Sequence, residues 1–433
     1  MKQTVERIFR KTLAAINIGA ALERKLDCNG RHVHADGKVV NLTDFSEFVA
    51  IAIGKASFAM AEGLNTVLPS QCSVDGILVA PAAPGKSLPR WSTFVGGHPI
   101  PTEASFIAGR AILDRLLRCN ERTLIFFLIS GGGSALVEQP LDPRITHQDF
   151  EKLHYALVTC GAPIEEINAV RKHLSAVKGG RLAAAAPLSM KLTFGISDVP
   201  EGHESALASG PTLPDPTTVA DAEQIVARYG LLPKLPASIR EIFEKRRLRE
   251  TPKESDPAFA RAHFSLLLGS HDLLHAAHHA LEAEGHFCIA DNTTDSWGLE
   301  KASDHLIGLL ESMKGKNSDR PCAIVADGEV SSPVTGNGIG GRNSAFVLTC
   351  VPKIAGKKIT VLSVGTDGID GNSSAAGAIA DGETMARALA AGMDSSAFLM
   401  RSDAYSFFAR LGDAITTGPT GNNLRDLRIL IAH

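Results

Sequence analysis

Short apolar runs alternate with helix-periodic segments along almost the whole chain. Several of these runs are nearly continuous in hydrophobicity: 48–53, 76–80, 124–129, 192–197, 265–269, 322–326, 359–364 and 428–432. Unbroken hydrophobicity is typical of strands that are covered on both faces, as in largely parallel sheets. The segments between them repeat apolar residues at helical spacing: 102–118, 147–160, 217–229, 271–284 and 382–391. This alternation predicts an α/β fold built from βαβ units.

The length of the chain indicates more than one domain, because 433 residues exceed what one hydrophobic core usually holds. The alternation breaks where proline and charge are dense, around residues 231–258. We expect an N-terminal domain over 1–240 with a Rossmann-like, mostly parallel sheet flanked by helices, a linker over 241–258, and a second α/β domain over 259–433. The first helix could pack on either domain. The expected active site is a cleft between the domains.

Composition and charge narrow the classes of function. The chain has 44 basic and 47 acidic residues, a formal net charge of −3, which argues against a nucleic-acid or anionic-membrane surface. The 7 cysteines lack C-x-x-C spacing, which favours buried thiols over disulfides or zinc. Glu6 and Asn17 interrupt the apolar N-terminus, and no run reaches membrane-spanning length. We therefore expect a cytoplasmic protein with small-molecule partners, and a homodimer stays open.

The run LIFFLISGGGSAL at 124–136 ends a predicted strand in glycines and a serine. In an open parallel sheet, ligands bind beyond the carboxyl ends of the strands, where main-chain N–H groups point outward. Gly131, Gly132 and Gly133 have no side chain that would keep an anion from the backbone, and Ser134 adds a hydroxyl. The alternative is a tight strand-to-helix turn with nothing bound. We interpret the segment as an anion-binding turn.

A second glycine cluster, Gly336–Gly341, matches the G-x-G-x-x-G pattern of dinucleotide-binding folds. However, it follows a polar turn instead of a strand, and no acid about twenty residues further on is placed for a ribose hydroxyl. Arg342 follows directly and carries a permanent positive charge. An anion site made by Gly340, Gly341 and Arg342 is therefore favoured over a dinucleotide site.

Charged residues gather after predicted strands and in one segment near a glycine pair: Lys55, Asp198, Asp327, Glu329, Asp367, Asp370, Arg171, Lys172, His173, Lys178 and Arg181. Lysine and arginine suit phosphates and carboxylates, whereas acids suit Mg²⁺ or a hydroxyl proton. For any one of them, a surface ion pair is the alternative. Together with the glycine turns, they indicate phosphoryl transfer, which needs an anion site, cations, a metal-binding acid and a base.

Several segments together are similar to one enzyme family: 52–57, 97–101, 130–136, 167–183, 196–199, 208–218, 340–343, 365–371 and 417–423. They resemble the class II glycerate kinases, which are glycerate 2-kinases with a C-terminal MOFRL domain, and whose bacterial members are often called hydroxypyruvate reductases. The resemblance extends from the first helix to near the C-terminus. It implies phosphorylation of D-glycerate that depends on ATP and Mg²⁺, usually on the 2-hydroxyl.

The resemblance also implies roles for single residues. Lys55 would hold a carboxylate or the transferred phosphate, and Asp198 would accept the hydroxyl proton or bind metal. Arg342 would stabilise the charge on the phosphoryl group. The remaining site predictions are phosphate or nucleotide binding by Gly131, Gly132, Gly133, Ser134, Gly340, Gly341 and Lys178, substrate binding by His98, Arg171, Lys172 and Asn343, and metal binding by Asp198, Glu329 and Asp367.

Several acid positions of the family pattern are not acids in this chain. The segments that replace them are Glu201-Gly202-His203, Asn372-Ser373-Ser374, Ser344-Ala345 and Thr102. Glu201 or Glu204 could take over one metal ligand; otherwise, metal use or the substrate pocket has changed. Two alternatives therefore remain. One is an NAD(P)H-dependent hydroxypyruvate reductase, which only the Gly336–Gly341 match supports, and the other is a ligand-binding relative without turnover.

Overall fold

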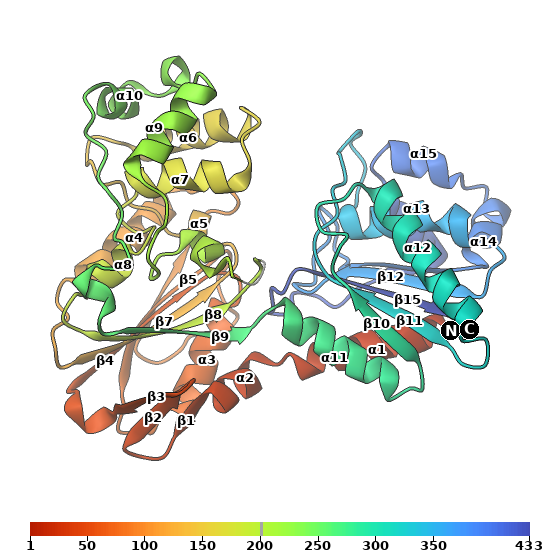
Figure 1. Cartoon of the computed structure of the whole chain (residues 1–433), viewed down its shortest axis with the longest axis horizontal. Helices are drawn as coiled ribbons and strands as arrows, with labels where there is room; N and C mark the ends of the chain where they lie inside the picture. The colour runs from red at the N-terminus through yellow and green to blue at the C-terminus, as the bar shows by residue number, and fades with distance from the viewer. Residues whose placement is uncertain (200–201) are drawn as a thin grey trace. The chain divides into compact units, whose positions relative to one another are not determined.

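A computed structural model of the chain describes residues 1–199 and 202–433 (Figure 1). The chain divides into two units, and each has a main sheet of its own. The N-terminal unit is Ile18–Leu267, and the C-terminal unit joins Met1–Asn17 to Leu268–His433. The first helix thus belongs to the C-terminal unit, which is one of the two possibilities that the sequence left open.

The segment 241–258 lies inside the N-terminal unit and not between the units. Lys253 in this segment donates a hydrogen bond to the carbonyl of Asp215 at 3.1 Å, and Arg181 donates to the carbonyl of Arg249 at 3.1 Å. Proline and charge predict a loop, but they do not distinguish a linker from a loop that packs on its own unit. The division between the units falls instead at Leu267 and Leu268.

The N-terminal unit contains a 6-stranded sheet in the order β6-β5-β4-β7-β8-β9. Its strands are β4 (Glu47–Ile53), β5 (Val74–Ala80), β6 (Trp91–Val95), β7 (Thr123–Ser130), β8 (Met190–Ile196) and β9 (Ala262–Leu268). All neighbours from β6 to β8 pair in parallel, which confirms the predicted sheet. The chain winds outward from β4 first to one side and then, from β7, to the other, as in a doubly wound Rossmann sheet. The topological switch point lies between β4 and β7.

Helices cover this sheet and form a second, smaller core. They are α2 (Ile18–Lys25), α3 (Ser57–Val67), α4 (Glu103–Leu116), α5 (Gly133–Leu136), α6 (His147–Val158), α7 (Ile164–Leu174), α8 (Arg181–Ala184), α9 (Val219–Arg228) and α10 (Ala237–Glu244). Every residue of β7 is buried, because apolar side chains fill both of its faces. Figure 1 shows α6, α7, α9 and α10 grouped together, and they share a core that includes Phe150, Val170, Ile225 and Ile239. A small sheet of β1 (Leu26–Cys28), β2 (His32–Ala35) and β3 (Lys38–Asn41) precedes β4.

The C-terminal unit contains a 6-stranded mixed sheet in the order β10-β11-β15-β12-β13-β14. Its strands are β10 (Phe287–Asp291), β11 (Cys322–Ala326), β12 (Ile359–Gly365), β13 (Gly377–Asp381), β14 (Ala414–Ile415) and β15 (Asp426–Ala432). Only β10 and β11 pair in parallel, because β15 inserts antiparallel between β11 and β12. The expectation of a largely parallel sheet is wrong for this unit. Continuous hydrophobicity indicates burial on both faces and does not fix strand direction.

Helices cover both faces of the mixed sheet. They are α1 (Lys2–Ala15), α11 (Ser270–Glu282), α12 (Leu299–Lys316), α13 (Arg342–Ile354), α14 (Thr384–Ala390), α15 (Ser395–Met400) and α16 (Ala404–Leu411). Figure 1 shows α12 and α13 on one face and α1 with α11 on the other. Even α12, with 18 residues, carries charges along its length. None of the helices in the described residues has the length and apolar composition that a membrane span requires.

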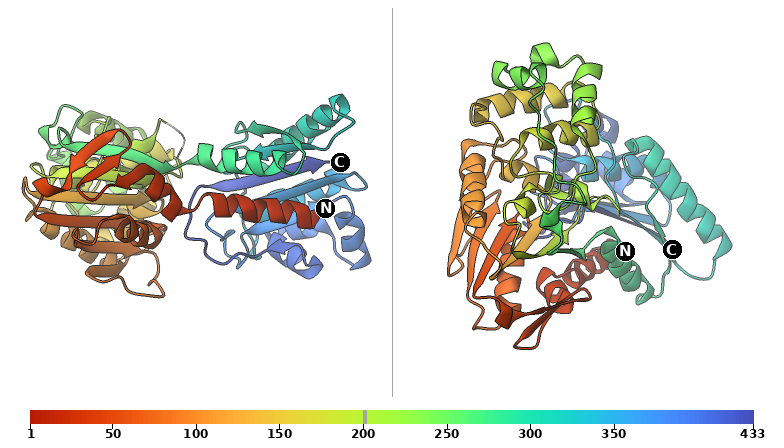
Figure 2. Two further views of the ribbon diagram at one scale, coloured as in Figure 1. Left: turned by 90° about the horizontal axis from the view of Figure 1, so that it is seen from below. Right: turned by 60° about the vertical axis from the view of Figure 1, so that its left-hand side comes forward.

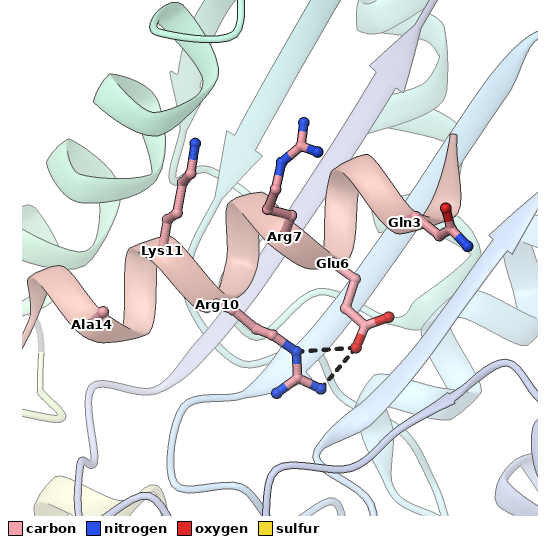
Figure 3. A pocket seen from close by; sticks show the side chains of 6 residues that line it. All are labelled: Gln3, Glu6, Arg7, Arg10, Lys11 and Ala14. Carbon is pink, nitrogen blue, oxygen red and sulfur yellow. Dashed lines mark hydrogen bonds and ion pairs between the residues drawn. The ribbon is translucent and has the colours of Figure 1, made fainter.

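The first helix, α1, packs beside α11 although the two are far apart in sequence (Figure 2). Lys2 Nζ pairs with Asp413 at 2.7 Å. The exposed face of α1 lines a shallow hollow formed by Gln3, Glu6, Arg7, Arg10, Lys11 and Ala14 (Figure 3). Charges on this face are paired within the unit: Arg10 with Glu6 at 2.7 Å, and both Arg7 and Lys11 with Glu284 at 2.8 Å.

Candidate active site

The carboxyl ends of five parallel strands form one edge of the N-terminal sheet. Ile53 of β4 is level with Ile129 of β7, and Ser130 is level with Ile196 of β8. On the other side of β4, β5 and β6 end level at Ala80 and Val95. The loops that follow β4, β6, β7 and β8 therefore leave the sheet at the same edge. They carry Lys55, His98, the Gly131–Gly133 turn and Asp198, in that order.

The loop after β4 is fixed against the glycine turn after β7, across the switch point. Gly54 has φ +127, and a Cβ atom there would lie 2.1 Å from Ser130 Oγ, so only glycine fits. The Lys55 N–H donates to the carbonyl of Gly131 at 3.0 Å, and the Ala56 N–H donates to Ser130 Oγ at 3.0 Å. The main chain of Lys55 is therefore held in register with the turn.

Lys55 and His98 both approach Gly132. This glycine has φ +83, and a Cβ atom there would lie 3.2 Å from His98 Cδ2 and 3.4 Å from Lys55 Cγ. Among the described residues, neither the Gly132 N–H nor the Gly133 N–H donates a hydrogen bond. The helix α5 that follows has only 4 residues, so its dipole adds little to the turn. At this turn, main-chain N–H groups without an acceptor among the described residues lie beside a lysine and a histidine, a combination that suits an anion.

Ser134 and Arg171 lie behind this turn. The two hydroxyls of Ser134 and Ser209 are 2.8 Å apart, and Arg171 Nη2 donates to the Ser134 carbonyl at 3.2 Å. Burial lowers the pKa of Arg171, which α7 carries in the interior. Arg171 therefore stabilises the turn through its hydrogen bond to the Ser134 carbonyl. A role in direct substrate binding, which the sequence predicted, does not fit this buried position.

Two lysines of the same sequence segment form buried ion pairs. Lys178, whose side chain is 1% exposed, donates to Glu138 Oε2 at 2.7 Å and to the Val137 carbonyl at 3.1 Å. Burial lowers the pKa of Lys178 to about 8. Lys172 Nζ lies 3.1 Å from Asp215 Oδ1. These contacts do not fit the predicted phosphate and substrate roles of the two lysines, because both ammonium groups are enclosed and paired with carboxylates.

Asp198 follows β8 by two residues and is half-buried. Glu201, one of the two residues that could replace a metal ligand, lies outside the described residues. Glu204 accepts a hydrogen bond from the Gly202 N–H at 2.9 Å. No group of three histidine, cysteine, aspartate or glutamate side chains that could hold a metal ion occurs within residues 1–199 and 202–433.

In the C-terminal unit, a carboxylate accepts the main-chain hydrogen bonds at the start of α13. Asp370 is buried, and its carboxylate accepts hydrogen bonds from the N–H groups of Gly341, Asn343 and Ser344 at 3.2, 2.9 and 2.9 Å. Burial raises the pKa of Asp370, although the hydrogen bonds from Ser344 and Asn343 oppose the shift. The Gly340 N–H donates to Asn372 Oδ1 at 2.8 Å. The amides that an external anion would need are therefore already occupied, and the predicted anion site at Gly340 and Gly341 does not fit.

Arg342, the first residue of α13, lies between two carboxylates. Its Nε and Nη2 donate to Asp426 at 2.5 and 3.1 Å, and its Nη2 lies 2.8 Å from Glu329 Oε1. Burial alone would lower the pKa of Arg342, but Asp426 and Glu329 hold it above its ordinary value. The side chain stays 37% exposed. Arg342 thus remains a fixed cation on a partly exposed side chain.

Two other predicted residues of this unit serve the local structure. Asn343 is buried, and its Oδ1 accepts a hydrogen bond from Ser363 Oγ at 2.6 Å, so it does not reach a substrate. Asp367 is half-buried, and its Oδ1 accepts from the Ile369 N–H at 3.1 Å. Asp367 keeps exposed surface that a ligand could approach.

Sequence reasoning missed Asp426, which orients Arg342. The signal was present, since Asp426 stands between Arg425 and Arg428 at the start of the last apolar run. An acid buried at a strand start needs a cationic partner, but the pattern alone does not identify Arg342, which lies far away in the sequence, as that partner.

Two family models match the chain. A model described as "Domain of unknown function (DUF4147)" matches residues 4–244, and the MOFRL family model matches residues 322–426. The first of these covers more than half of the chain.

Known proteins are similar over nearly the full length. A glycerate 2-kinase from Pyrococcus horikoshii is 33% identical, over 98% of this chain and 93% of the relative. A protein from Agrobacterium vitis that carries the provisional name of a hydroxypyruvate reductase is 36% identical, over 92% of this chain and 91% of the relative. The crystal structure of a glycerate kinase from Thermotoga maritima is similar with a TM-score of 0.86 at 30% identity, and the match covers 100% of this chain and 99% of that chain.

Proposed function

The chain belongs to the class II glycerate kinase family, in which a DUF4147 domain precedes a MOFRL domain, and from this premise we propose that it phosphorylates D-glycerate with ATP. The acceptor in this proposal is the 2-hydroxyl, the position in the name of the Pyrococcus relative. The products would be 2-phosphoglycerate and ADP.

One observation carries the proposal more than any other. Lys55 and His98 both approach Gly132 at the switch point of a parallel sheet, the position where such sheets bind ligands. A lysine beside main-chain amides that lack an acceptor suits a phosphate, since the amides supply hydrogen bonds and the lysine supplies charge. A nicotinamide cofactor would instead need its pyrophosphate at the start of a longer helix, whereas α5 after this turn has only 4 residues.

The proposed reaction is a direct displacement at phosphorus. The 2-hydroxyl oxygen of glycerate attacks the γ-phosphorus of ATP, and the bond from that phosphorus to the bridging oxygen breaks, leaving its electron pair on ADP. Asp198 accepts the hydroxyl proton. Lys55 and the N–H groups of Gly132 and Gly133 bind phosphate oxygens, His98 binds the glycerate carboxylate, and Arg342 stabilises charge on the transferred group.

Magnesium is part of the proposal, because it accompanies nucleotide substrates and neutralises charge on the transferring phosphates. Mg²⁺ usually keeps several waters and binds one or two protein carboxylates plus substrate phosphates. Two carboxylates among the described residues, those of Asp198 and Asp367, fit this pattern because they are half-buried and keep exposed surface. Asp198 and Asp367 are the proposed ligands. Glu329 is a poorer candidate, because its carboxylate is paired with Arg342.

The reductase alternative depends on the Gly336–Gly341 turn. There the carboxylate of Asp370 takes the N–H groups that a pyrophosphate would need. A dinucleotide would have to displace a buried carboxylate with several hydrogen bonds. This geometry gives the reductase no support. The second alternative, a ligand-binding relative, differs from the kinase only in turnover.

The test is incubation of the full chain with ATP, Mg²⁺ and D-glycerate, with ADP release followed over time and the product identified by ³¹P NMR. We expect ADP and 2-phosphoglycerate in equal amounts. Absence of phosphoglycerate with both Mg²⁺ and Mn²⁺ would overturn the proposal. Loss of NADH absorbance with hydroxypyruvate would establish the reductase instead, and heat of ATP or glycerate binding without turnover would establish the ligand-binding alternative.

We also propose a cytoplasmic location. All of the cysteines, Cys28, Cys72, Cys119, Cys160, Cys288, Cys322 and Cys350, are free thiols. Free thiols suit a reducing compartment. Fractionation of cells that express the tagged protein tests the proposal, which a membrane-associated or secreted pool would contradict.

A further inference from the structure

The strand β15 and the helix α13 face each other with matched spacing in the C-terminal unit. Asp426 and Arg428 lie two residues apart on β15, which separates them by about 6.6 Å. Arg342 and Phe346 lie four residues apart on α13, which separates them by about 6 Å. Arg342 pairs with Asp426, and the Arg428 guanidinium lies 5.6 Å from the centre of the Phe346 ring. The first turn of α13 is therefore fixed to the start of β15 at two successive positions.

The strand side of this contact is buried. Asp426 is 2% exposed and Arg428 is fully buried. Arg428 Nη2 donates to the carbonyl of Asp327, and its Nη2 lies 3.5 Å from Thr294 Oγ1. Because these groups are enclosed by the sheet and by α13, the carboxylate of Asp426 cannot swing out to solvent. The Asp426 carboxylate therefore keeps a fixed position, in which it accepts hydrogen bonds from Nε and Nη2 of Arg342.

Glu329 differs from Asp426 in each of these respects. It follows β11, its side chain is 42% exposed, and its Oε1 lies 2.8 Å from Arg342 Nη2. An exposed carboxylate on a loop costs little to displace, whereas a buried carboxylate that accepts two hydrogen bonds from one guanidinium does not exchange. The two acids therefore act on the same cation in different ways.

We infer that Asp426 is the positioning residue for Arg342. Glu329 has a different role: its carboxylate pairs with Arg342 when no nucleotide is bound, and a phosphate of the nucleotide displaces it. Asp426 holds the guanidinium plane and leaves the other edge for the incoming phosphate. Glu329 occupies Arg342 Nη2 until the nucleotide binds. The inference rests on the proposed kinase function, since it assigns how one residue of that site is oriented and made available.

The test compares two substitutions that each remove one negative charge beside Arg342. Asp426→Asn places an amide N–H against a guanidinium N–H, so the plane of Arg342 is no longer fixed. We expect kcat to fall about 10- to 100-fold, the range for residues that orient a catalytic group. Glu329→Gln removes the competing anion, and we expect the KM for ATP to fall about two- to five-fold, as loss of an exposed ion pair allows.

Controls separate this inference from loss of folding. Asp75→Asn breaks an exposed ion pair with Arg90 in the N-terminal unit and should leave both constants within two-fold of wild type. Circular dichroism and thermal melting report the folded fraction of each variant. If Asp426→Asn does not fold, Asp426→Glu, which keeps the charge and shifts the carboxylate by one methylene, should show the fall in kcat instead.

Two outcomes would overturn the inference in an active enzyme: a folded Asp426 variant with kcat within three-fold of wild type, or Glu329→Gln with the same fall in kcat as the Asp426 variant. If the wild-type protein releases no ADP with glycerate, the proposed function fails and calorimetry with ATP still tests the inference. Glu329→Gln should then bind ATP about two- to five-fold more tightly than wild type, and equal or weaker binding would refute the role of Glu329.

Discussion

The glycine turn after β7 and the glycine turn before α13 look alike in sequence and differ in what surrounds them. At the first turn, Lys55 and His98 approach Gly132, and the N–H groups of Gly132 and Gly133 have no acceptor among the described residues. At the second turn, the carboxylate of Asp370 occupies the amides at the start of α13. A glycine-rich sequence thus supplies main-chain donors in both places, but only one set of donors is available to a ligand.

The difference arises from residues that are distant in sequence. Asp370 lies after β12, yet it satisfies the donors at the start of α13, as any buried amide requires. The turn after β7 lies instead at the switch point of a parallel sheet, where diverging connections leave space for a ligand. A glycine-rich turn therefore predicts an anion site only where no carboxylate of the protein already accepts hydrogen bonds from its N–H groups.

The largest expected effect concerns the buried ion pair between Lys178 and Glu138. Lys178→Met leaves the buried Glu138 without its cation, and we expect the free energy of unfolding to fall by about 3–5 kcal/mol. Urea denaturation measures the change. The double variant Lys178→Met/Glu138→Gln should recover much of the loss. A stable Lys178→Met protein with lost ATP binding would instead support the phosphate-binding role predicted from the sequence.

The next effect concerns Lys55 itself. Lys55→Ala removes the proposed charge beside the first turn, and kcat should fall about 10²- to 10³-fold while the thermal midpoint stays near wild type. Lys86→Ala is the matched control, because Lys86 is an exposed lysine of the same unit, paired with Glu62. Steady-state kinetics of ADP release gives both values. A Lys55→Ala enzyme that keeps a third or more of the wild-type kcat would remove Lys55 from the mechanism.

A smaller effect is expected at the second turn. Asp370→Ala frees the amides at the start of α13, and the free energy of unfolding should fall by about 2–3 kcal/mol. Asp394→Ala is the control, because Asp394 caps α15 through a single bond to the Ser396 N–H and should cost about 1 kcal/mol. Sulfate should raise the thermal midpoint of Asp370→Ala more than that of wild type, since the uncovered helix start can now bind an anion. Equal losses of unfolding free energy in the two variants would show that Asp370 does not satisfy the N–H groups at the start of α13.

Much of the fold could be predicted because the buried strands are apolar throughout. The runs at 48–53, 124–129 and 322–326 match β4, β7 and β11 within two residues. The edge strand β6 was missed because its sequence WSTFV is half polar and no residue of it is buried, so it carries no apolar run. The direction of β15 was also not predictable, since the residues of a two-sided buried strand look the same in either direction.

The candidate site could be predicted only in part, for a different reason. Lys55 and Gly132 stand directly after predicted strands, so the βαβ pattern already placed them at one edge of the sheet. His98 follows β6, which the pattern missed, and only the family resemblance indicated it. Lys178 and Asn343 have suitable chemistry in the right segments, but both are buried. Burial depends on which residues pack over a side chain, and one-dimensional spacing does not contain that information. Asp426 was missed for the same reason.

The smallest expected effect gives the most direct test of the central claim, that Lys55 and His98 meet at Gly132, where Lys55 binds a phosphate and His98 binds the glycerate carboxylate. Gly132 and Gly161 have φ of +83 and +82, but a Cβ atom at Gly161 would have no neighbour within 4 Å. Alanine at either position should therefore cost the same strain, roughly 1–2 kcal/mol. Only Gly132→Ala would push against the side chains of Lys55 and His98.

The measurement is kcat/KM for ATP in Gly132→Ala and Gly161→Ala, with the thermal midpoint of each. We predict similar midpoints for the two variants, and a kcat/KM that falls about tenfold in Gly132→Ala and stays within two-fold of wild type in Gly161→Ala. Equal kcat/KM values in the two variants would contradict the account, because they would show that the space beside Gly132 has no part in the reaction.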